Sequence, residues 1–168
     1  MKEWAIRIML LAALAAVGFW AWRTLYPNPE RIIKKRLAEM AQTASFSSNQ
    51  GLAAQAWAAS SLAEYFALDV EITLNVPGAQ RTFSGRDEVM QVAVTARRIC
   101  RSLSIRFPDI KVTLSPDKTS AEVSVTGEAD VTYASGGKEF HLQELRLRLI
   151  KVEREWLIKQ VETVKTLS

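Results

Sequence analysis

Few side chains in this sequence could carry acid–base chemistry. His141 is the single histidine in 168 residues. Glu162 could orient its ring, and Tyr133 or Tyr65 could act as a hydrogen-bond donor. A histidine that is held by a carboxylate can accept and return a proton near neutral pH. A lone histidine near a hairpin is more often an exposed side chain, however, so we assign no residue a catalytic role.

The composition argues against a metal or cofactor site. The chain has one cysteine and one histidine, which cannot form a Cys/His metal cluster or an internal disulfide framework. Hydrophobic residues make up 48% of the chain and charged residues 24%, which excludes a disordered or fibrous protein. We therefore expect a globular domain without a resident metal or cofactor.

The formal net charge of +4 is concentrated near the N-terminus. Residues 1–36 hold seven basic and two acidic side chains, whereas the remainder holds 15 basic and 16 acidic ones. Because the remainder is nearly neutral, it should not bind nucleic acid. Basic clusters beside an apolar helix commonly contact anionic lipid headgroups, so residues 1–36 predict contact with membrane lipid.

The N-terminal residues also predict a membrane anchor. Residues 8–22 carry no charge, and their flanking apolar residues bring the stretch near the ~20 residues that cross a bilayer. The alternative is a cleaved signal peptide with its site at Ala16-Val17-Gly18. The bulky Phe19 and Trp20 that follow favour an uncleaved anchor, which we place at residues 1–27.

This interpretation predicts a single-pass membrane protein whose domain, residues 28–168, lies outside the cytoplasm. A short leading tail followed by a whole domain is typical of an exported domain. Lys2 and Arg7 before the span agree with this orientation, but the basic residues after it do not, and the charge rule taken alone favours the opposite orientation.

Hydrophobic spacing predicts three helices that must position these groups. Asn28-Pro29-Glu30 is typical of a helix start, and the helix should run to about Ala44. A second helix is expected at residues 50–66. A third should cover residues 86–102, with Ser84 as its cap. Its predicted inner positions include Val92 and Ile99, and Arg97 is expected to face outward.

Alternating apolar and polar residues predict strands in the rest of the chain. Along residues 138–152 the apolar face includes Leu145 and Leu149 and continues to Gln143 and His141. The apolar parity flips at Pro108, which indicates a bulge. The predicted strands are residues 70–76, 81–83, 103–115, 121–133, 138–152 and 155–166. Three helices on one strongly curved, mostly antiparallel sheet make an α+β domain, preceded by one transmembrane helix.

Three segments resemble the nuclear transport factor 2-like superfamily, which includes SnoaL-like and ketosteroid-isomerase-like proteins. Residues 65–72 read YFALDVEI, similar to the family's Y-F-A-x-D-V entry into its first strand. Residues 85–89 read GRDEV, similar to the G-R-E-x-[ILV] start of the third helix. Residues 155–158 resemble the closing G-x-W-x-I strand, although Arg154 stands where that pattern has glycine.

The resemblance covers about residues 29–166 and implies a cone-shaped domain with one pocket between the helices and the sheet. It also implies a homodimer through the outer face of the sheet. No catalytic residue transfers, because none of the matched segments is a catalytic one. The side chains that we expect at the pocket are Trp57, Tyr65, Tyr133, His141, Gln143 and Glu162.

Three functions remain open from the sequence. The first is a membrane-anchored, noncatalytic domain that binds a small apolar ligand or a protein partner, because the inner face has few ionisable groups. The second is an isomerase, dehydratase or hydrolase of the SnoaL-like kind that uses His141 with an acidic neighbour. The third is a scaffold for assembly of the cell envelope.

Overall fold

The computed structural model describes residues 15–16, 28–47, 51–76 and 79–164. The helices of the folded domain are α2 (Pro29–Ala44), α3 (Leu52–Ala63) and α4 (Arg86–Ile99). The strands are β1 (Phe66–Val76), β2 (Ala79–Ser84), β3 (Cys100–Leu114), β4 (Ser120–Tyr133), β5 (Lys138–Val152) and β6 (Glu155–Thr163). The predicted α+β class and order of elements are confirmed.

The start of α2 follows the predicted pattern. The side chain of Asn28 accepts a hydrogen bond from the Glu30 amide at 3.0 Å, and Pro29 occupies the first helical turn. The cap satisfies an amide that has no partner inside the helix. Ile33 and Leu37 then lie one turn apart on the buried side of α2.

The six strands form one sheet in the order β2-β1-β6-β5-β4-β3. β1 and β6 run parallel, and every other neighbouring pair is antiparallel. The register of β3 on β4 shifts between Arg106 and Asp109, so β3 has one extra residue there. This shift confirms the bulge that the change of parity at Pro108 predicts.

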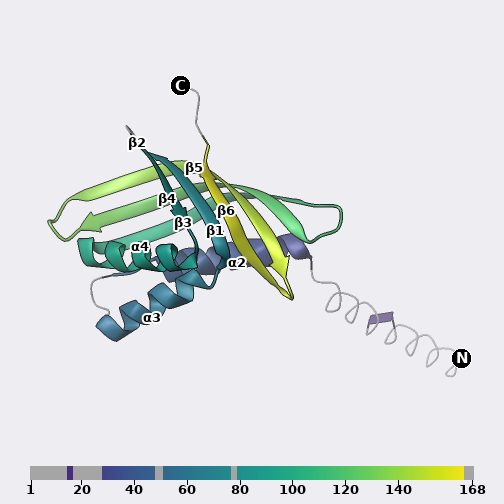
Figure 1. Cartoon of the computed structure of the whole chain (residues 1–168), viewed down its shortest axis with the longest axis horizontal. Helices are drawn as coiled ribbons and strands as arrows, with labels where there is room; N and C mark the ends of the chain where they lie inside the picture. The colour runs from purple at the N-terminus through teal and green to yellow at the C-terminus, as the bar shows by residue number, and fades with distance from the viewer. Residues whose placement is uncertain (1–14, 17–27, 48–50, 77–78, 165–168) are drawn as a thin grey trace, which may run out of the picture.

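Helices α2 and α4 cover the concave face of the curled sheet, and Figure 1 shows them beneath the long strands. The core lies between these two layers. Its largest fully buried side chains come from α2 and from several strands. They are Ile33, Leu37, Val70, Val123, Leu149 and Trp156. Burying aromatic and aliphatic side chains in this way supplies the main stabilisation of such a layered fold.

Two predictions for α4 are wrong. Its N-cap is Gly85 rather than Ser84, because the chain turns there with a φ of 88°, which glycine adopts without strain. Arg97 points inward and is only 7% exposed, whereas Ile99, which is predicted to face inward, is 55% exposed. The buried stripe of α4 is Val89, Ala93 and Arg97, each four residues after the last.

The predicted localisation needs correction. Among the residues that the structure describes, no helix is both long and apolar enough to cross a bilayer. This finding contradicts the prediction of a single-pass membrane protein. The predicted span at residues 8–22 lies outside the described residues, apart from Ala15 and Ala16. Most of the predicted lipid contact at residues 1–36 lies outside them as well.

Candidate functional site

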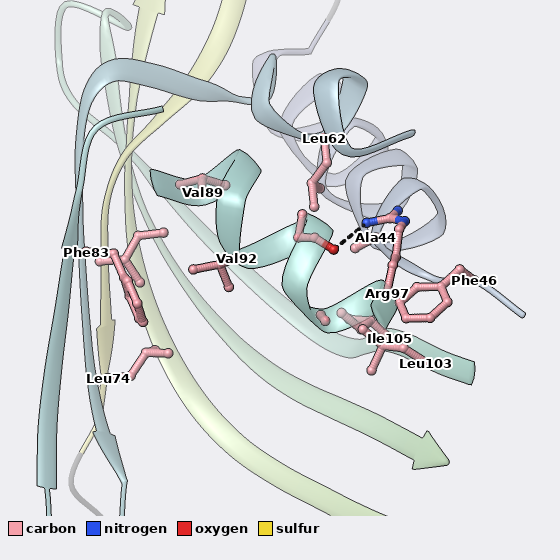
Figure 2. Close-up of a pocket in the computed structure, with 13 residues that line it drawn as sticks. Ala44, Phe46, Leu62, Leu74, Phe83, Val89, Val92, Arg97, Leu103 and Ile105 are labelled. Atoms are coloured by element: carbon pink, nitrogen blue, oxygen red, sulfur yellow. Dashed lines mark hydrogen bonds between the residues drawn. The ribbon is translucent and has the colours of Figure 1, made fainter. Parts of the chain in front are cut away.

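A cavity of about 200 Å³ lies between α4 and the concave face of the sheet. The antiparallel register of β1 and β2 places Ile72 opposite Phe83, and both side chains line this cavity. Figure 2 shows Val89 and Val92 of α4 on the other side of the space from Phe83 and Leu74. The complete lining is Ala44, Phe46, Leu62, Ile72, Leu74, Phe83, Val89, Val92, Ala93, Ala96, Arg97, Leu103 and Ile105.

Arg97 is the one ionisable residue in that lining. Its guanidinium donates to the backbone oxygens of Ala93, at 3.2 Å, and Thr43, at 3.1 Å. It also lies 5.0 Å from the centre of the Phe46 ring, and Figure 2 shows the two side chains together at the end of the lining away from Leu74. Burial lowers the pKa of Arg97 below its usual range. The guanidinium thus joins α4 to the end of α2.

A second hollow of about 360 Å³ adjoins this cavity. Phe83, Val92 and Ala96 line both spaces, and the remainder of the second lining is more polar. Those other residues are Arg81, Glu88, Gln91, Thr95 and Ile99. The α4 residues among them recur every three or four positions, so they lie on one face of the helix beside β2.

Tyr133 and His141 come together away from the cavity, through a residue outside the predicted set. The carboxylate of Glu139 accepts a hydrogen bond from the Tyr133 hydroxyl at 3.0 Å and lies 3.1 Å from His141 Nε2. The hydrogen bond to Glu139 raises the pKa of Tyr133 above its usual value of 10.0. Glu139 and His141 are exposed, so water surrounds this cluster.

Glu162 does not join His141. β6 carries an extra residue at Lys159, because Leu149 pairs with Ile158 and Arg148 with Gln160. Ile158 before the bulge and Val161 after it are both buried, so the alternation of side chains shifts by one residue at the bulge. Glu162, next to Val161, therefore faces the side of the sheet away from the core. There it accepts a hydrogen bond from Gln160 at 2.7 Å. The proposed pairing of His141 with Glu162 therefore does not form.

The other predicted site residues also lie outside the lining of the apolar cavity. Trp57 is 73% exposed on α3. The ring of Tyr65 packs beside the core under the guanidinium of Arg36, 5.0 Å away. Gln143 is half-buried, and its amide donates to the backbone oxygens of Glu144 and Val164 near the end of β6.

Sequence reasoning missed the role of Arg97 and the pairing through Glu139. The four-residue spacing of Val89, Ala93 and Arg97 was a usable signal for Arg97, since it places the three on one face of a helix. The cavity itself offers no carboxylate, imidazole, phenol or thiol in its lining. Such a surface can bind an apolar group, but it supplies no proton donor or acceptor of the usual catalytic kinds.

No protein-family model matches the sequence, and no curated protein does. Solved structures do match. A candidate scytalone dehydratase from Novosphingobium aromaticivorans has a TM-score of 0.63 and 17% identity, over 80% of this chain and 83% of that one. A candidate dehydratase of the nuclear transport factor 2-like family, from Streptomyces avermitilis, has a TM-score of 0.62 and 12% identity, over 82% and 97%. The domain has the nuclear transport factor 2-like fold.

Another structure with this nuclear transport factor 2-like fold is a candidate aromatic ring hydroxylase from N. aromaticivorans. Its TM-score is 0.66 at 11% identity, over 83% of this chain and 91% of that one. Likeness at this identity concerns the fold alone. The fold that the three sequence segments indicate is therefore confirmed, and the differing activities in these names leave the function to the residues of the site.

Proposed function

We propose that this domain binds a small apolar ligand in the cavity between α4 and the sheet. The observation that supports the proposal is the lining, in which every side chain except Arg97 is hydrocarbon. Concave apolar surfaces with few polar groups are typical of sites for small molecules. The size also sets a limit, because an apolar cavity of about 150 Å³ holds benzene. At about 200 Å³, the site suits one substituted ring or a short acyl chain.

The proposed role is noncatalytic. Acid–base catalysis needs a proton-accepting or proton-donating group within hydrogen-bond reach of the ligand. Arg97 is a poor candidate, since two backbone oxygens already occupy its terminal nitrogens. A guanidinium in a protein also stays protonated at physiological pH. The chemistry of the lining thus favours binding over turnover.

A cavity-filling substitution tests the proposal. Ala96 lines both hollows and is half-buried, so Ala96→Phe should place a ring in the binding space. Ala53→Phe on the exposed side of α3 adds the same ring elsewhere. We expect toluene, titrated into the full chain, to shift the amide NMR signals of α4 saturably in the wild type and in Ala53→Phe. Ala96→Phe should weaken this binding at least about tenfold.

Val92→Phe is the second variant if Ala96→Phe does not fold, because Val92 also lines both hollows. Circular dichroism of each variant establishes that the fold is retained. Absence of saturable shifts in the wild type would contradict the proposal. Equal affinities in the wild type and the cavity-filling variants would contradict it too.

The Tyr133–Glu139–His141 cluster supports one alternative function, a SnoaL-like dehydratase or isomerase. If His141 Nε2 donates to Glu139, then Nδ1 carries a free lone pair and can act as a base. Scytalone is a reasonable first substrate, in view of the name of one structural neighbour. This alternative expects turnover by the wild type and its loss in His141→Ala. Unchanged turnover in His141→Ala, or none in the wild type, would count against it.

A further inference from the structure

The apolar cavity continues into the polar hollow between α4 and β2. The shared side chains are Phe83, Val92 and Ala96, which form a hydrophobic strip from one space to the other. A ligand that fills the first space therefore has its outer end among Arg81, Glu88, Gln91 and Thr95. The site has a hydrocarbon interior and a polar entrance. A ligand that matches it would have an apolar part at one end and a polar group at the other.

The register of the β1–β2 hairpin determines where Arg81 points. Arg81 pairs with Leu74, and two residues further along β2 Phe83 pairs with Ile72. Side chains two residues apart in a strand lie on the same face. Since Leu74, Phe83 and Ile72 all line the cavity, Arg81 emerges from that same face, next to the entrance.

The two charged side chains of the entrance, Glu88 and Arg81, differ in whether they already have interaction partners. The Glu88 carboxylate accepts a hydrogen bond from the backbone amide of Ser84, at the start of α4. Within the described part of the chain, the Arg81 guanidinium forms no ion pair, and its residue is exposed. Arg81 therefore offers its fork of N–H donors to an incoming group, and the fork geometry matches a carboxylate.

We propose that the ligand is a small amphipathic carboxylate, with its hydrocarbon part in the cavity and its carboxylate paired with Arg81. Gln91 and Thr95 lie on the helix side of the entrance and can donate further hydrogen bonds to the same group. This inference rests on the proposed function, because it assumes that the apolar cavity is occupied. It adds the chemical class of the ligand and the residue that selects it.

Octanoate and octan-1-ol are suitable probes, because they share a hydrocarbon chain and differ in charge. We would titrate each into the full chain at neutral pH and follow binding by calorimetry and by the α4 amide signals. The wild type should bind octanoate about threefold to fivefold more tightly than octan-1-ol, as expected for an exposed, charge-assisted pair. Arg81→Gln should remove most of that preference, because it should weaken octanoate binding far more than octan-1-ol binding.

Two more variants sharpen the test. Glu88→Gln removes the negative charge of the entrance and keeps a side-chain oxygen for the Ser84 amide, so it should strengthen octanoate binding a few-fold. Arg146→Gln removes one positive charge from the opposite face of the sheet, where Arg146 pairs with Glu122. This control should bind both probes as the wild type does, which separates a local effect from a change in net charge.

The outcomes distinguish the two proposals. If both probes bind equally well, or if Arg81→Gln and Arg146→Gln have equal effects, the carboxylate inference is overturned and the apolar site stands. If octanoate preference persists in Arg81→Gln but disappears in Arg146→Gln, Arg81 is not the selecting residue. Binding of neither probe contradicts the apolar site itself, and the inference falls with it.

Discussion

Arg97 on α4 donates a hydrogen bond of 3.1 Å to the backbone oxygen of Thr43, one residue before the end of α2. The last carbonyls of a helix lack partners within the helix, so a buried end needs a donor from elsewhere. Arg97 provides one while its charged group lies over the Phe46 ring. The domain therefore uses this guanidinium to join two helices and to close one end of the cavity.

Removing this contact should destabilise the domain. In Arg97→Ala the partly buried Thr43 oxygen loses its donor, and leaving such an acceptor unsatisfied costs about 1–3 kcal/mol. We expect the free energy of unfolding in urea to fall by about this amount. Arg98→Ala, at the exposed neighbouring position, should change it by less than about 0.5 kcal/mol. Equal effects of the two substitutions would show that Arg97 does not join the helices.

Two tryptophans provide a second comparison. Trp156 is 2% exposed at the centre of the core, whereas Trp57 is among the most exposed large hydrophobic side chains. Trp156→Ala should lower the free energy of unfolding by about 3–5 kcal/mol, because it removes a fully buried ring. Trp57→Ala should have little effect on stability. A large loss in Trp57→Ala, measured by guanidinium denaturation, would instead place that ring in a contact.

Asp117 should titrate at unusually low pH. Hydrogen bonds from Ser115 and Thr119 in the turn between β3 and β4 lower its pKa from 3.8 to about 2. Its contribution to stability is therefore complete above pH 3.8 and is lost as the pH falls through about 2. Carbon NMR of the carboxyl group measures the pKa directly. The double substitution Ser115→Ala and Thr119→Ala should raise it, and an unchanged value would contradict this origin.

The pKa of Tyr133 should fall toward 10.0 in Glu139→Gln, because the substitution removes the carboxylate that holds the neutral phenol. In the wild type this interaction stabilises the fold below pH 10.0 and is lost as the pH rises through the raised pKa. Difference absorbance of the tyrosinate follows the titration. Glu144→Gln on the same strand serves as the control and should leave the Tyr133 titration unchanged.

Homodimer formation through the outer sheet face stays a prediction from the family resemblance. Phe140 and Leu142 are exposed on β5, on the face opposite the buried Leu147 and Leu149. If this face forms the dimer, Leu142→Asp should shift the protein toward monomer in sedimentation experiments, because it buries a charge at the interface. Leu68→Asp, at an exposed position of β1, should leave the dimer intact. A monomeric wild type would overturn the prediction.

Local sequence signals predict much of this fold. The Asn28-Pro29-Glu30 start, the alternation along β4 and β5 and the parity change at Pro108 all act through neighbouring residues. The strand starts were less accurate at β1, which begins at Phe66 rather than at residue 70. There Phe66 pairs with Ile158 of β6, a contact between distant parts of the chain that no local pattern contains.

The candidate site was less predictable for the same reason. The bulge at Lys159 depends on how β5 and β6 align, and it turns Glu162 away from His141. The sequence predicts Arg97 on the outer side of α4, because charged side chains are rarely buried. Its burial is favourable because the guanidinium contacts the Thr43 oxygen and the Phe46 ring. Both come from another part of the chain, so no local pattern around Arg97 contains them.

The parallel pairing of β1 with β6 also affects the order of assembly during protein synthesis. The ribosome releases the β1–β2 hairpin long before β6, yet β6 is the strand that connects this hairpin to β5. Until then the inner edge of β1 lacks its neighbour and can pair with other chains. A nascent domain interrupted before Glu155 would therefore expose an aggregation-prone edge, and chaperone binding should be strongest at that stage.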